Sequence, residues 1–213
     1  MGEERRPNVV LGIPTFPHVP MDFCLSLAIL DGSRCGGKAI FSDQRSNLPD
    51  SRNFIVEAAK EAFRKVGPGY DCDYLLFLDS DMTFPPHTLT RLLAHKKDIV
   101  GCAYRRRCPP YDIMGWTPDP ETRRLDPLND AGLVRVGKLP TGVMLIDMKI
   151  FEKMEKPYFN YRLAENGKLM SEDIVFCEAA VAAGIEIWCD MDLTMEVGHI
   201  GHTVFRPGVS YVQ

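Results

Sequence analysis

Short apolar segments alternate with longer segments of helical periodicity through the first half of the chain, and Gly, Pro, Asp or Ser residues separate them. The apolar segments predict strands at Asn8–Ile13, Lys38–Ser42, Tyr74–Leu78 and Asp98–Ala103. The periodic segments predict helices at Pro20–Leu30, at Asp50–Lys65 with an end at Gly67-Pro68-Gly69, and at Pro86–His95. This order predicts an α/β fold with a mostly parallel sheet and helices on both faces.

The second half is less regular. From Tyr104 to Lys138 repeated prolines interrupt any long element, and only Leu133–Val136 predicts a short strand. Loops of this length in compact domains often serve as binding loops or lids. Beyond them we expect strands at Gly142–Asp147, Ile185–Cys189 and Thr194–Val197, and helices at Lys149–Glu155 and Ser171–Ala183.

Composition narrows the class of protein. With 213 residues, of which 45% are hydrophobic and 25% charged, we expect a single globular domain spanning residues 1–213. The net charge of −4 gives no general attraction to nucleic acid or to anionic membranes. No segment approaches the ~20 apolar residues needed to cross a bilayer, and no signal peptide is visible. The seven cysteines form no CxxC pair, so we expect reduced thiols in a cytoplasmic protein, while the oligomeric state is not indicated.

Three Asp-x-Asp pairs occur in the chain. Asp79 and Asp81 follow the predicted strand Tyr74–Leu78, at the carboxyl end where ligands gather in open α/β sheets. The Asp71/Asp73 pair precedes the same strand and should lie roughly 20 Å away. The Asp190/Asp192 pair also follows a strand and remains a competitor. Two carboxylates separated by one residue can hold Mg²⁺ or Mn²⁺ together with substrate phosphates, although Asp is also common in ordinary turns.

Six motifs occur in an order that resembles a known family. They are IPT from Ile13, SRN from Ser51, FLDSD from Phe77, LPTGVMLID from Leu139, SEDIVFCEAAVAAGIEIW from Ser171 and VGHIG from Val197. This combination resembles nucleotide-sugar-dependent glycosyltransferases of the GT-A type, in the broad family-2-like group. The resemblance covers nearly the whole chain. It implies a donor-binding half at residues 1–103 and an acceptor-binding half at residues 104–213.

The resemblance implies that Asp79 and Asp81 bind a divalent cation, Mn²⁺ or Mg²⁺, and the diphosphate region of a nucleoside diphosphate sugar. Such a cation would stabilise the charge that accumulates on the departing diphosphate. Ser80 would act as the spacer of this donor site. The resemblance makes His199 the third metal ligand, with His202 as the alternative.

Asp173, or else Glu172, is the general base that the resemblance implies for the acceptor hydroxyl group. Ser171 fits a helix N-cap, and acidic residues favour the first turn of a helix, so these residues also have a purely structural interpretation. The positive end of a helix stabilises the charged carboxylate and weakens it as a base. A function in orienting the acceptor is therefore the alternative.

Further donor contacts are implied at the same edge of the sheet. Arg52 is the most attractive of them, because a guanidinium group grips phosphate oxygens, although an exposed Arg near a helix start is usually only solvated. The other residues implied in nucleotide-sugar binding are Pro14, Thr15, Asp43, Asn53, Thr141 and Gly142. The segment SDQRSNLPD, from Ser42, departs from the acidic, Gly/Ser-rich turn of commoner relatives and leaves the nucleotide open.

Two other functions fit parts of the pattern. A nucleotidyltransferase would need a Gly-rich, basic loop after the first strand, and GIPTFPHVP, from Gly12, has one Gly and no Lys or Arg. A non-catalytic sugar- or nucleotide-binding module would not need the carboxylates and His199 together. The acceptor stays open among a polysaccharide, a lipid-linked sugar, a protein side chain and a modified DNA base. The arginines Arg105, Arg106 and Arg107 keep the last option without favouring it, since they also fit a solvated face.

Overall fold

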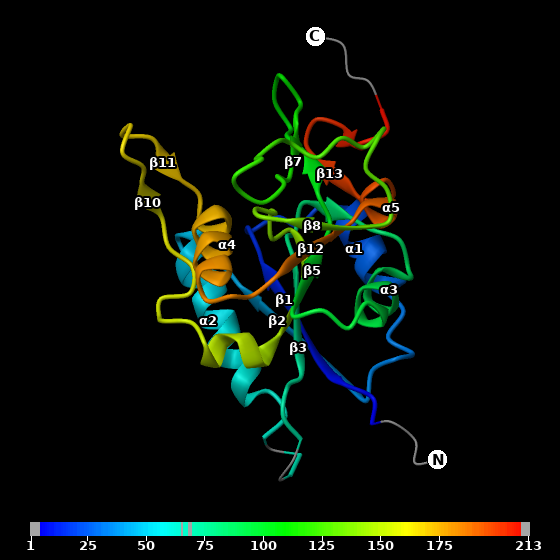
Figure 1. Ribbon diagram of the computed structural model, residues 1–213. Helices are drawn as coiled ribbons and strands as arrows, with labels where there is room; N and C mark the ends of the chain where they lie inside the picture. The colour runs from blue at the N-terminus through cyan, green and yellow to red at the C-terminus, as the bar shows by residue number, and fades with distance from the viewer. Residues whose placement is uncertain (1–4, 65, 68–69, 210–213) are drawn as a thin grey trace.

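Within the residues that the computed structural model describes, 5–64, 66–67 and 70–209, seven strands form a central sheet (Figure 1). In spatial order they are β2 (Gly37–Asp43), β1 (Asn8–Pro14), β3 (Tyr74–Leu78), β9 (Val143–Asp147), β5 (Ile99–Gly101), β12 (Ile187–Asp190) and β8 (Leu133–Val136). β1 is parallel to β2 and β3, and β12 is parallel to β5, whereas β9 and β8 run antiparallel to their neighbours. Most strands therefore share one direction, and the predicted α/β fold class is confirmed.

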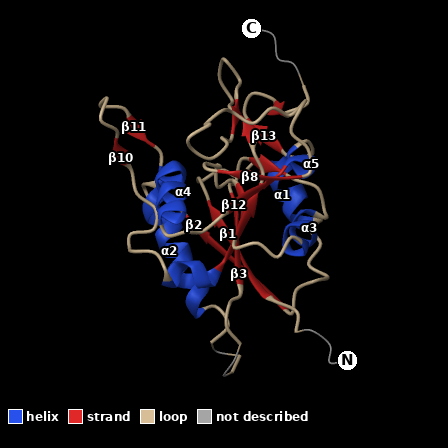
Figure 2. Ribbon diagram, viewed as in Figure 1, coloured by secondary structure: helices blue, strands red, loops and turns tan. Residues whose placement is uncertain are grey.

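Helices cover both faces of the sheet (Figure 2). α2 (Leu48–Glu61) and α4 (Glu172–Ala182) lie on one face, and α1 (Met21–Ala28) and α3 (Thr88–Ala94) lie on the other. Strand β3 shows how the sequence specifies these two layers. Leu75 and Phe77 are buried in the core cluster with α2 and α4, whereas Leu76 and Leu78 are buried in the cluster with α1 and α3. The alternating side chains of one strand thus support both layers.

Smaller elements complete the fold around the central sheet. A second, three-stranded sheet consists of β14 (Val204–Phe205), β13 (Gly198–Ile200) and β4 (Met82–Thr83). Two further strand pairs are β6 (Tyr104–Arg105) with β7 (Ile113–Met114), and β10 (Arg162–Leu163) with β11 (Leu169–Met170). The remaining elements are a 3₁₀ helix, η1 (Met148–Glu152), and the short helix α5 (Met191–Thr194).

One predicted strand is wrong. The segment 194–197 does not form a strand, because α5 ends at Thr194 and the next strand, β13, begins only at Gly198. Asp190 starts α5 by accepting a hydrogen bond from the Leu193 amide at 2.9 Å, a cap that favours a helical turn over continued extension.

The predicted end of the second helix lies partly outside the described residues, which exclude Lys65, Pro68 and Gly69. α2 itself ends at Glu61, and Gly67 has a positive φ of 146°. Among the helices of the described residues, none has the length and apolar character needed to cross a bilayer.

Candidate functional site

Asp79 and Asp81 are fixed at the carboxyl end of β3 by backbone hydrogen bonds on two sides. The Asp79 amide donates to the Gly142 carbonyl at 2.9 Å, which continues the β3–β9 pairing. The Ile200 amide donates to the Asp81 carbonyl at 2.7 Å. Because β13 pairs with β4, His199 lies opposite Met82, the residue that follows Asp81. Sheet pairing therefore brings the late histidine beside the Asp-x-Asp motif.

His199 faces Asp81 with a defined ring orientation. Its Nδ1 lies 2.8 Å from the Arg105 carbonyl, and this nitrogen must donate because a carbonyl only accepts. Its Nε2 is therefore turned toward Asp81, 3.4 Å from Oδ2. In the neutral ring this nitrogen carries a lone pair, so the arrangement is favourable only with a proton or a cation between the two groups.

The charge of Asp81 is stabilised by two neighbours. Burial acts to raise its pKa, but His199 and Arg107 outweigh burial, and the pKa of Asp81 lies below its ordinary value. Arg107 is half-exposed and its Nη1 lies 2.8 Å from Asp81 Oδ2. Of the three consecutive arginines 105–107, Arg107 therefore lies beside Asp81, a candidate metal ligand.

The residues at this edge fit an open site for a hard divalent cation. Asp81 and His199 present an oxygen and a nitrogen toward one point, and such ions commonly complete their coordination with water and substrate phosphates. Among the described residues no group of three or more His, Cys, Asp or Glu side chains is arranged as a complete metal centre. The Asp79 carboxylate accepts hydrogen bonds from Arg52.

Arg52 is buried beneath Asp79 and carries an ion-pair network through the core. Its Nη2 donates to both carboxylate oxygens of Asp79, at 2.9 and 3.1 Å, and its Nε donates to Glu172 Oε1 at 3.2 Å. Only 2% of the Arg52 side chain is exposed. The alternative that Arg52 is a solvated surface charge is therefore wrong, because its guanidinium group joins α2, β3 and α4.

Burial and the opposite charges of this network act on its pKa values in opposite directions. Burial disfavours the charge of Arg52, yet Asp79 and Glu172 prevail and raise its pKa. Burial raises the pKa of Asp79 and of Glu172 as well, and Arg52 opposes the shift in both. The Nη1 atom of Arg52 is buried and has no hydrogen-bond partner among the described residues. The two N–H groups of Nη1 therefore remain for a further acceptor.

Asp173 lies at the start of α4, partly exposed, beside this network. Its Oδ1 accepts from the Ser171 hydroxyl group and, at 2.7 Å, from the Ile174 amide. Its charge acts on Asp79 and Arg52, so it belongs to the same electrostatic cluster. Glu172 is buried and paired with Arg52, which leaves Asp173 as the more accessible carboxylate of the two.

Tyr104, which belongs to none of the six sequence motifs, connects these groups. Its buried hydroxyl group accepts from the Gly142 amide at 3.1 Å, and its ring packs edge-on against His199 at 4.9 Å. Burial and the charges of Asp79, Asp173 and Asp81 raise its pKa far above the ordinary value. Its position at the start of an irregular, proline-rich segment gave no periodic signal for this role.

Other residues expected to bind the donor lie at the carboxyl ends of β1 and β2 and on α2. Pro14 is buried at the end of β1, and the Thr15 amide donates to the Asp43 carbonyl at 2.8 Å, at the end of β2. The Asp43 carboxylate pairs with Arg45 at 3.3 Å. Asn53 Nδ2 donates to the Phe159 carbonyl at 2.7 Å. The nucleotide contacts of these residues stay predictions.

Three residues frame Asp79 closely. Ser80 and Thr141 are buried, and Thr141 Oγ1 has no partner among the described residues. At Gly142 an added Cβ would lie 2.5 Å from the Tyr104 hydroxyl oxygen, so only glycine permits this contact. Tyr104 thus fills the space beside the Gly142 Cα, and the part that Gly142 plays in nucleotide-sugar binding stays a prediction.

Two aromatic residues of the long irregular segment contact the protein itself. Tyr111 stacks on Phe205 at 5.2 Å, and the Arg124 guanidinium lies over the Trp116 ring at 5.2 Å. His202, the alternative metal ligand, also packs against Phe205, at 5.0 Å. The contact with Asp81 is made by His199.

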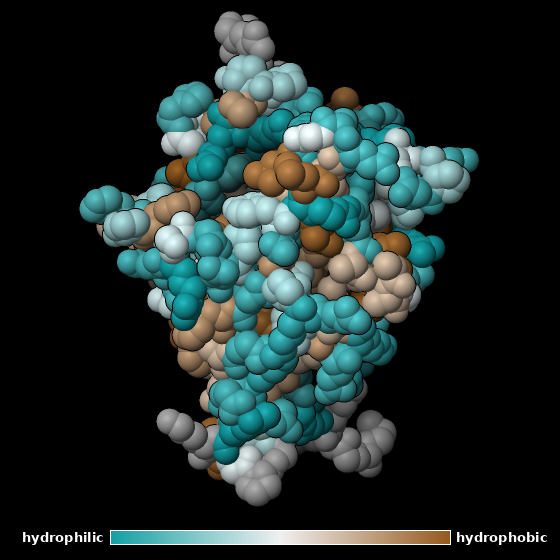
Figure 3. All heavy atoms as spheres, turned by 90° about the vertical axis from the view of Figure 1, so that its left-hand side faces the viewer, coloured by the Kyte–Doolittle hydropathy of each residue, from teal (hydrophilic) through white to brown (hydrophobic). Residues whose placement is uncertain are grey.

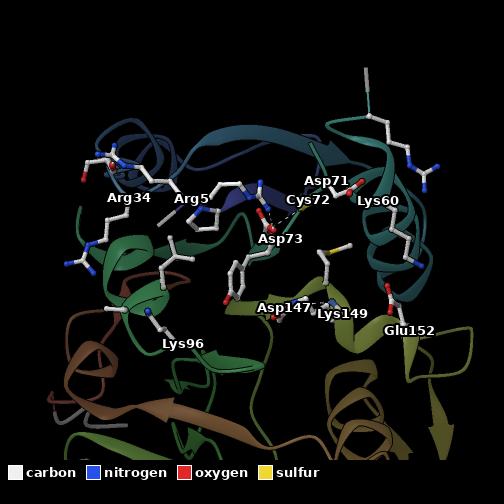
Figure 4. Close-up of a pocket in the computed structure, with 18 residues that line it drawn as sticks. Arg5, Arg34, Lys60, Asp71, Cys72, Asp73, Lys96, Asp147, Lys149 and Glu152 are labelled. Atoms are coloured by element: carbon white, nitrogen blue, oxygen red, sulfur yellow. Dashed lines mark hydrogen bonds and ion pairs between the residues drawn. The ribbon is translucent and has the colours of Figure 1, made fainter. Parts of the chain in front are cut away.

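The Asp71/Asp73 pair lies at the opposite edge of the sheet. Asp73 accepts from Arg5 Nη2 at 2.6 Å and from the Asn8 amide at 2.7 Å, and so fixes the start of β1 to the start of β3. Both aspartates line a cavity of about 970 Å³ that Figure 4 shows from close by. Both basic and acidic side chains line this cavity, and Asp79, Asp81 and His199 are not among its lining residues.

The Asp190/Asp192 pair binds basic side chains of α3 and of its C-cap. The buried Asp190 carboxylate binds Arg91 Nε at 2.5 Å and His95 Nε2 at 2.7 Å, and Asp192 binds Arg91 Nη2 at 2.9 Å. Burial opposes the charge of Asp190, but these partners lower its pKa overall. This pair therefore has structural partners where a metal site would need free oxygens.

Replacing Asp190 by alanine is expected to lower the free energy of unfolding by about 1–3 kcal/mol, because Arg91, His95 and the Leu193 amide lose the carboxylate that they bind, while Arg91 keeps its contact with Asp192. Denaturant unfolding measures this loss. Donor binding by the folded fraction should persist. A variant of normal stability that lost metal-dependent donor binding would instead place the cation at the third pair.

Comparison with known proteins shows the fold. No family model and no curated protein matches the sequence. The crystal structure of A197 from STIV resembles the chain with a TM-score of 0.60 over 97% of both chains, at 15% identity. S. aureus TarS 1-349 in complex with UDP-GlcNAc matches with a TM-score of 0.48, 14% identity and coverage of 87% of this chain and 56% of that chain, which adds nothing to the fold assignment. The whole-chain likeness to A197 shows that the two proteins share an α/β fold.

Proposed function

We infer that this protein transfers a sugar from a nucleoside diphosphate sugar to an acceptor hydroxyl group with the help of a divalent cation. The observation that carries this proposal is the convergence of Asp81, His199, Arg52 and Asp173 at the carboxyl edge of the sheet, from four separate segments of the chain. Carboxyl edges are where α/β sheets bind their ligands. The fold alone does not imply this chemistry.

On the donor side, Asp81 and His199 would hold Mn²⁺ or Mg²⁺, which would supply positive charge to the departing diphosphate. Arg52 positions the Asp79 carboxylate through two hydrogen bonds. Arg107 lies beside Asp81 and is half-exposed, so it is suited to contact phosphate oxygens when a donor enters. These contacts would hold the diphosphate while the bond from its terminal phosphate oxygen to the sugar breaks.

On the acceptor side, Asp173 accepts the proton of the attacking hydroxyl group. Its Oδ1 is committed to Ser171 and to the Ile174 amide, which fixes the carboxylate in one orientation. The oxygen Oδ2 remains for the acceptor. Glu172 is buried against Arg52 and keeps that guanidinium in place.

Changing Asp173 to asparagine is expected to reduce transfer by roughly 10²–10⁴-fold, because the side chain retains its shape but no longer accepts the proton. Donor binding should be unchanged, since Asp173 does not contact the proposed cation site. Steady-state transfer and donor titration separate the two effects. Loss of donor binding together with transfer would assign Asp173 to the donor site.

A panel of nucleotide sugars that includes UDP-GlcNAc, tested for thermal stabilisation and hydrolysis with Mn²⁺, tests the proposal without requiring the acceptor. Stabilisation that depends on both sugar nucleotide and cation is the expected result. With a base at Asp173 we expect inversion at the anomeric carbon. A product with the donor's own anomeric configuration would refute inversion.

A further inference from the structure

The two carboxylates of the Asp-x-Asp motif have arginine partners of different kinds. Arg52, the partner of Asp79, is 2% exposed and joins β3 to the helices α2 and α4. Figure 3 faces these two helices and shows mostly hydrophilic side chains over their outer side. Arg107, the partner of Asp81, is 49% exposed. The protein therefore encloses the first ion pair and leaves the second open to solvent and to ligands.

The exposed ion pair can be exchanged readily. Removing the partner of a buried charge is strongly destabilising, whereas an exposed pair contributes little to stability. Arg107 Nη1 lies 2.8 Å from Asp81 Oδ2 and donates a long hydrogen bond to the Ile200 carbonyl at 3.4 Å. The Nε and Nη2 groups of Arg107 make no hydrogen bond with any described residue. Three of its N–H groups thus remain for an incoming acceptor.

This ion pair occupies the oxygen that a cation would need. Asp81 Oδ2 lies 3.4 Å from His199 Nε2 as well as 2.8 Å from Arg107 Nη1. In an octahedral site with bonds of about 2.1 Å, neighbouring ligand atoms lie roughly 3 Å apart, so Oδ2 and Nε2 are spaced like such a pair. A dication between them would adjoin a guanidinium group on the same oxygen. Because like charges repel, the cation and Arg107 compete for Oδ2.

A diphosphate would supply the anion that Arg107 loses in this competition. When it binds the cation, it brings negatively charged oxygens beside Asp81, where Arg107 already lies. A guanidinium group binds phosphate oxygens through parallel N–H groups, more strongly than a neutral donor does. Arg52 cannot make this exchange, because it is enclosed and holds both Asp79 and Glu172. Of these two arginines, only Arg107 can move from the protein to the ligand.

We propose that Arg107 is an exchangeable counter-ion of the cation site. In the donor-free protein it pairs with Asp81 and opposes the cation, and when the cation and the donor diphosphate enter together it moves from Asp81 to the diphosphate. The two ligands then strengthen each other's binding, because both favour the same position of Arg107. This inference rests on the proposed glycosyltransferase site and adds to it a device that couples its cation to its donor.

Two other functions of Arg107 predict different results. If Arg107 only supported the structure of the site, its removal would weaken binding of the cation alone. If Arg107 only added positive charge to this surface, the adjacent Arg106 would be equivalent to it. The Arg106 side chain makes no hydrogen bond or ion pair with any described residue, and only its backbone amide is bonded, to the Asp112 carbonyl. The exchange predicts opposite effects on the two ligands at Arg107 and no effect at Arg106.

The test compares Arg107→Met with the wild type, using Mn²⁺ alone and Mn²⁺ premixed with inorganic pyrophosphate. Electron paramagnetic resonance of free Mn²⁺ gives the affinity for the cation, which should rise about two- to fivefold in the variant, the equivalent of one exposed ion pair. Titration calorimetry gives the affinity for Mn²⁺–pyrophosphate, which should fall about tenfold or more, because a charge-assisted contact is lost. The matched variant Arg106→Met removes the same charge from the adjacent position and should change neither affinity.

Two further measurements accompany the comparison. Circular dichroism verifies that the variants fold. Asp81→Ala should abolish binding of both probes, which assigns them to this site. Probes that still bind to Asp81→Ala would lie elsewhere and would overturn the inference.

The proposal would also be overturned if Arg107→Met bound Mn²⁺ alone no more tightly than the wild type, if it bound Mn²⁺–pyrophosphate equally well, or if Arg106→Met had the same effects. A wild-type protein that binds neither probe would count against the cation site and, with it, the proposed function. If the wild type binds both probes but no nucleotide sugar of the panel, the exchange at Arg107 stands and the glycosyltransferase activity does not.

Discussion

Replacing Asp81 by alanine is expected to abolish metal-dependent donor binding, whereas replacing Asp71 by alanine should leave it intact. Asp81 faces His199 at 3.4 Å and keeps its charge because its pKa is lowered. Loss of an outer partner of a metal ligand typically costs roughly 10–100-fold in affinity, and loss of a ligand itself should cost more. Titration calorimetry with the donor, with and without Mn²⁺, measures the effect.

Asp71 is a matched control for this prediction. It belongs to the same kind of motif, but it is exposed at the opposite edge of the sheet, where it lines the cavity of Figure 4. Equal loss of donor binding in both variants would mean that the affinity does not reside at Asp81, and the proposed donor site would be wrong.

Replacing Arg52 by methionine should destabilise the protein by about 3–5 kcal/mol near neutral pH, because it leaves the buried Glu172 and the partly buried Asp79 without their cation. Chemical denaturation measures this loss. Arg107 provides the control, since it is half-exposed and its ion pair with Asp81 is a surface contact. Arg107→Met should change the stability by about 1 kcal/mol or less.

The same variant should recover stability as the pH falls. The pKa values of Asp79 and Glu172 are already raised in the folded protein, and removing Arg52 raises them further. The folded state then binds protons more tightly than the unfolded state, so stability increases as the pH falls through the raised values toward the ordinary values of 3.8 and 4.5. An Arg52→Met variant whose deficit grows on acidification would contradict this account of the network.

The sequence predicted the elements that local pattern controls. The ranges Tyr74–Leu78 and Leu133–Val136 agree with β3 and β8, because the first is a continuous apolar run and the second is bounded by clear turn residues. The direction of β9 could not be predicted, because its connection from β5 runs through the irregular segment from Tyr104 to Lys138. The strand predicted at 194–197 was wrong because Asp190 caps the helix α5, which ends at Thr194. The Asp190 carboxylate is buried through its contact with Arg91 of α3, which the local pattern could not predict.

The candidate site was predicted as a set of residues, and the structure brings several of them together. His199 was expected near Asp81, and β-pairing places it there. The burial of Arg52 had a signal in the sequence. Arg52 is followed at helical spacing by Ile55, Val56 and Ala59, and all four lie on the buried side of α2. Tyr104 had no such signal, because its contacts come from three segments that are distant in sequence.

The most direct test of the proposed function is a crystal of the protein soaked with Mn²⁺ and a nucleoside diphosphate sugar. An anomalous manganese peak between Asp81 Oδ2 and His199 Nε2, with the donor diphosphate in contact with it, is the predicted result. A bound donor with no ion beside these two atoms would contradict the account.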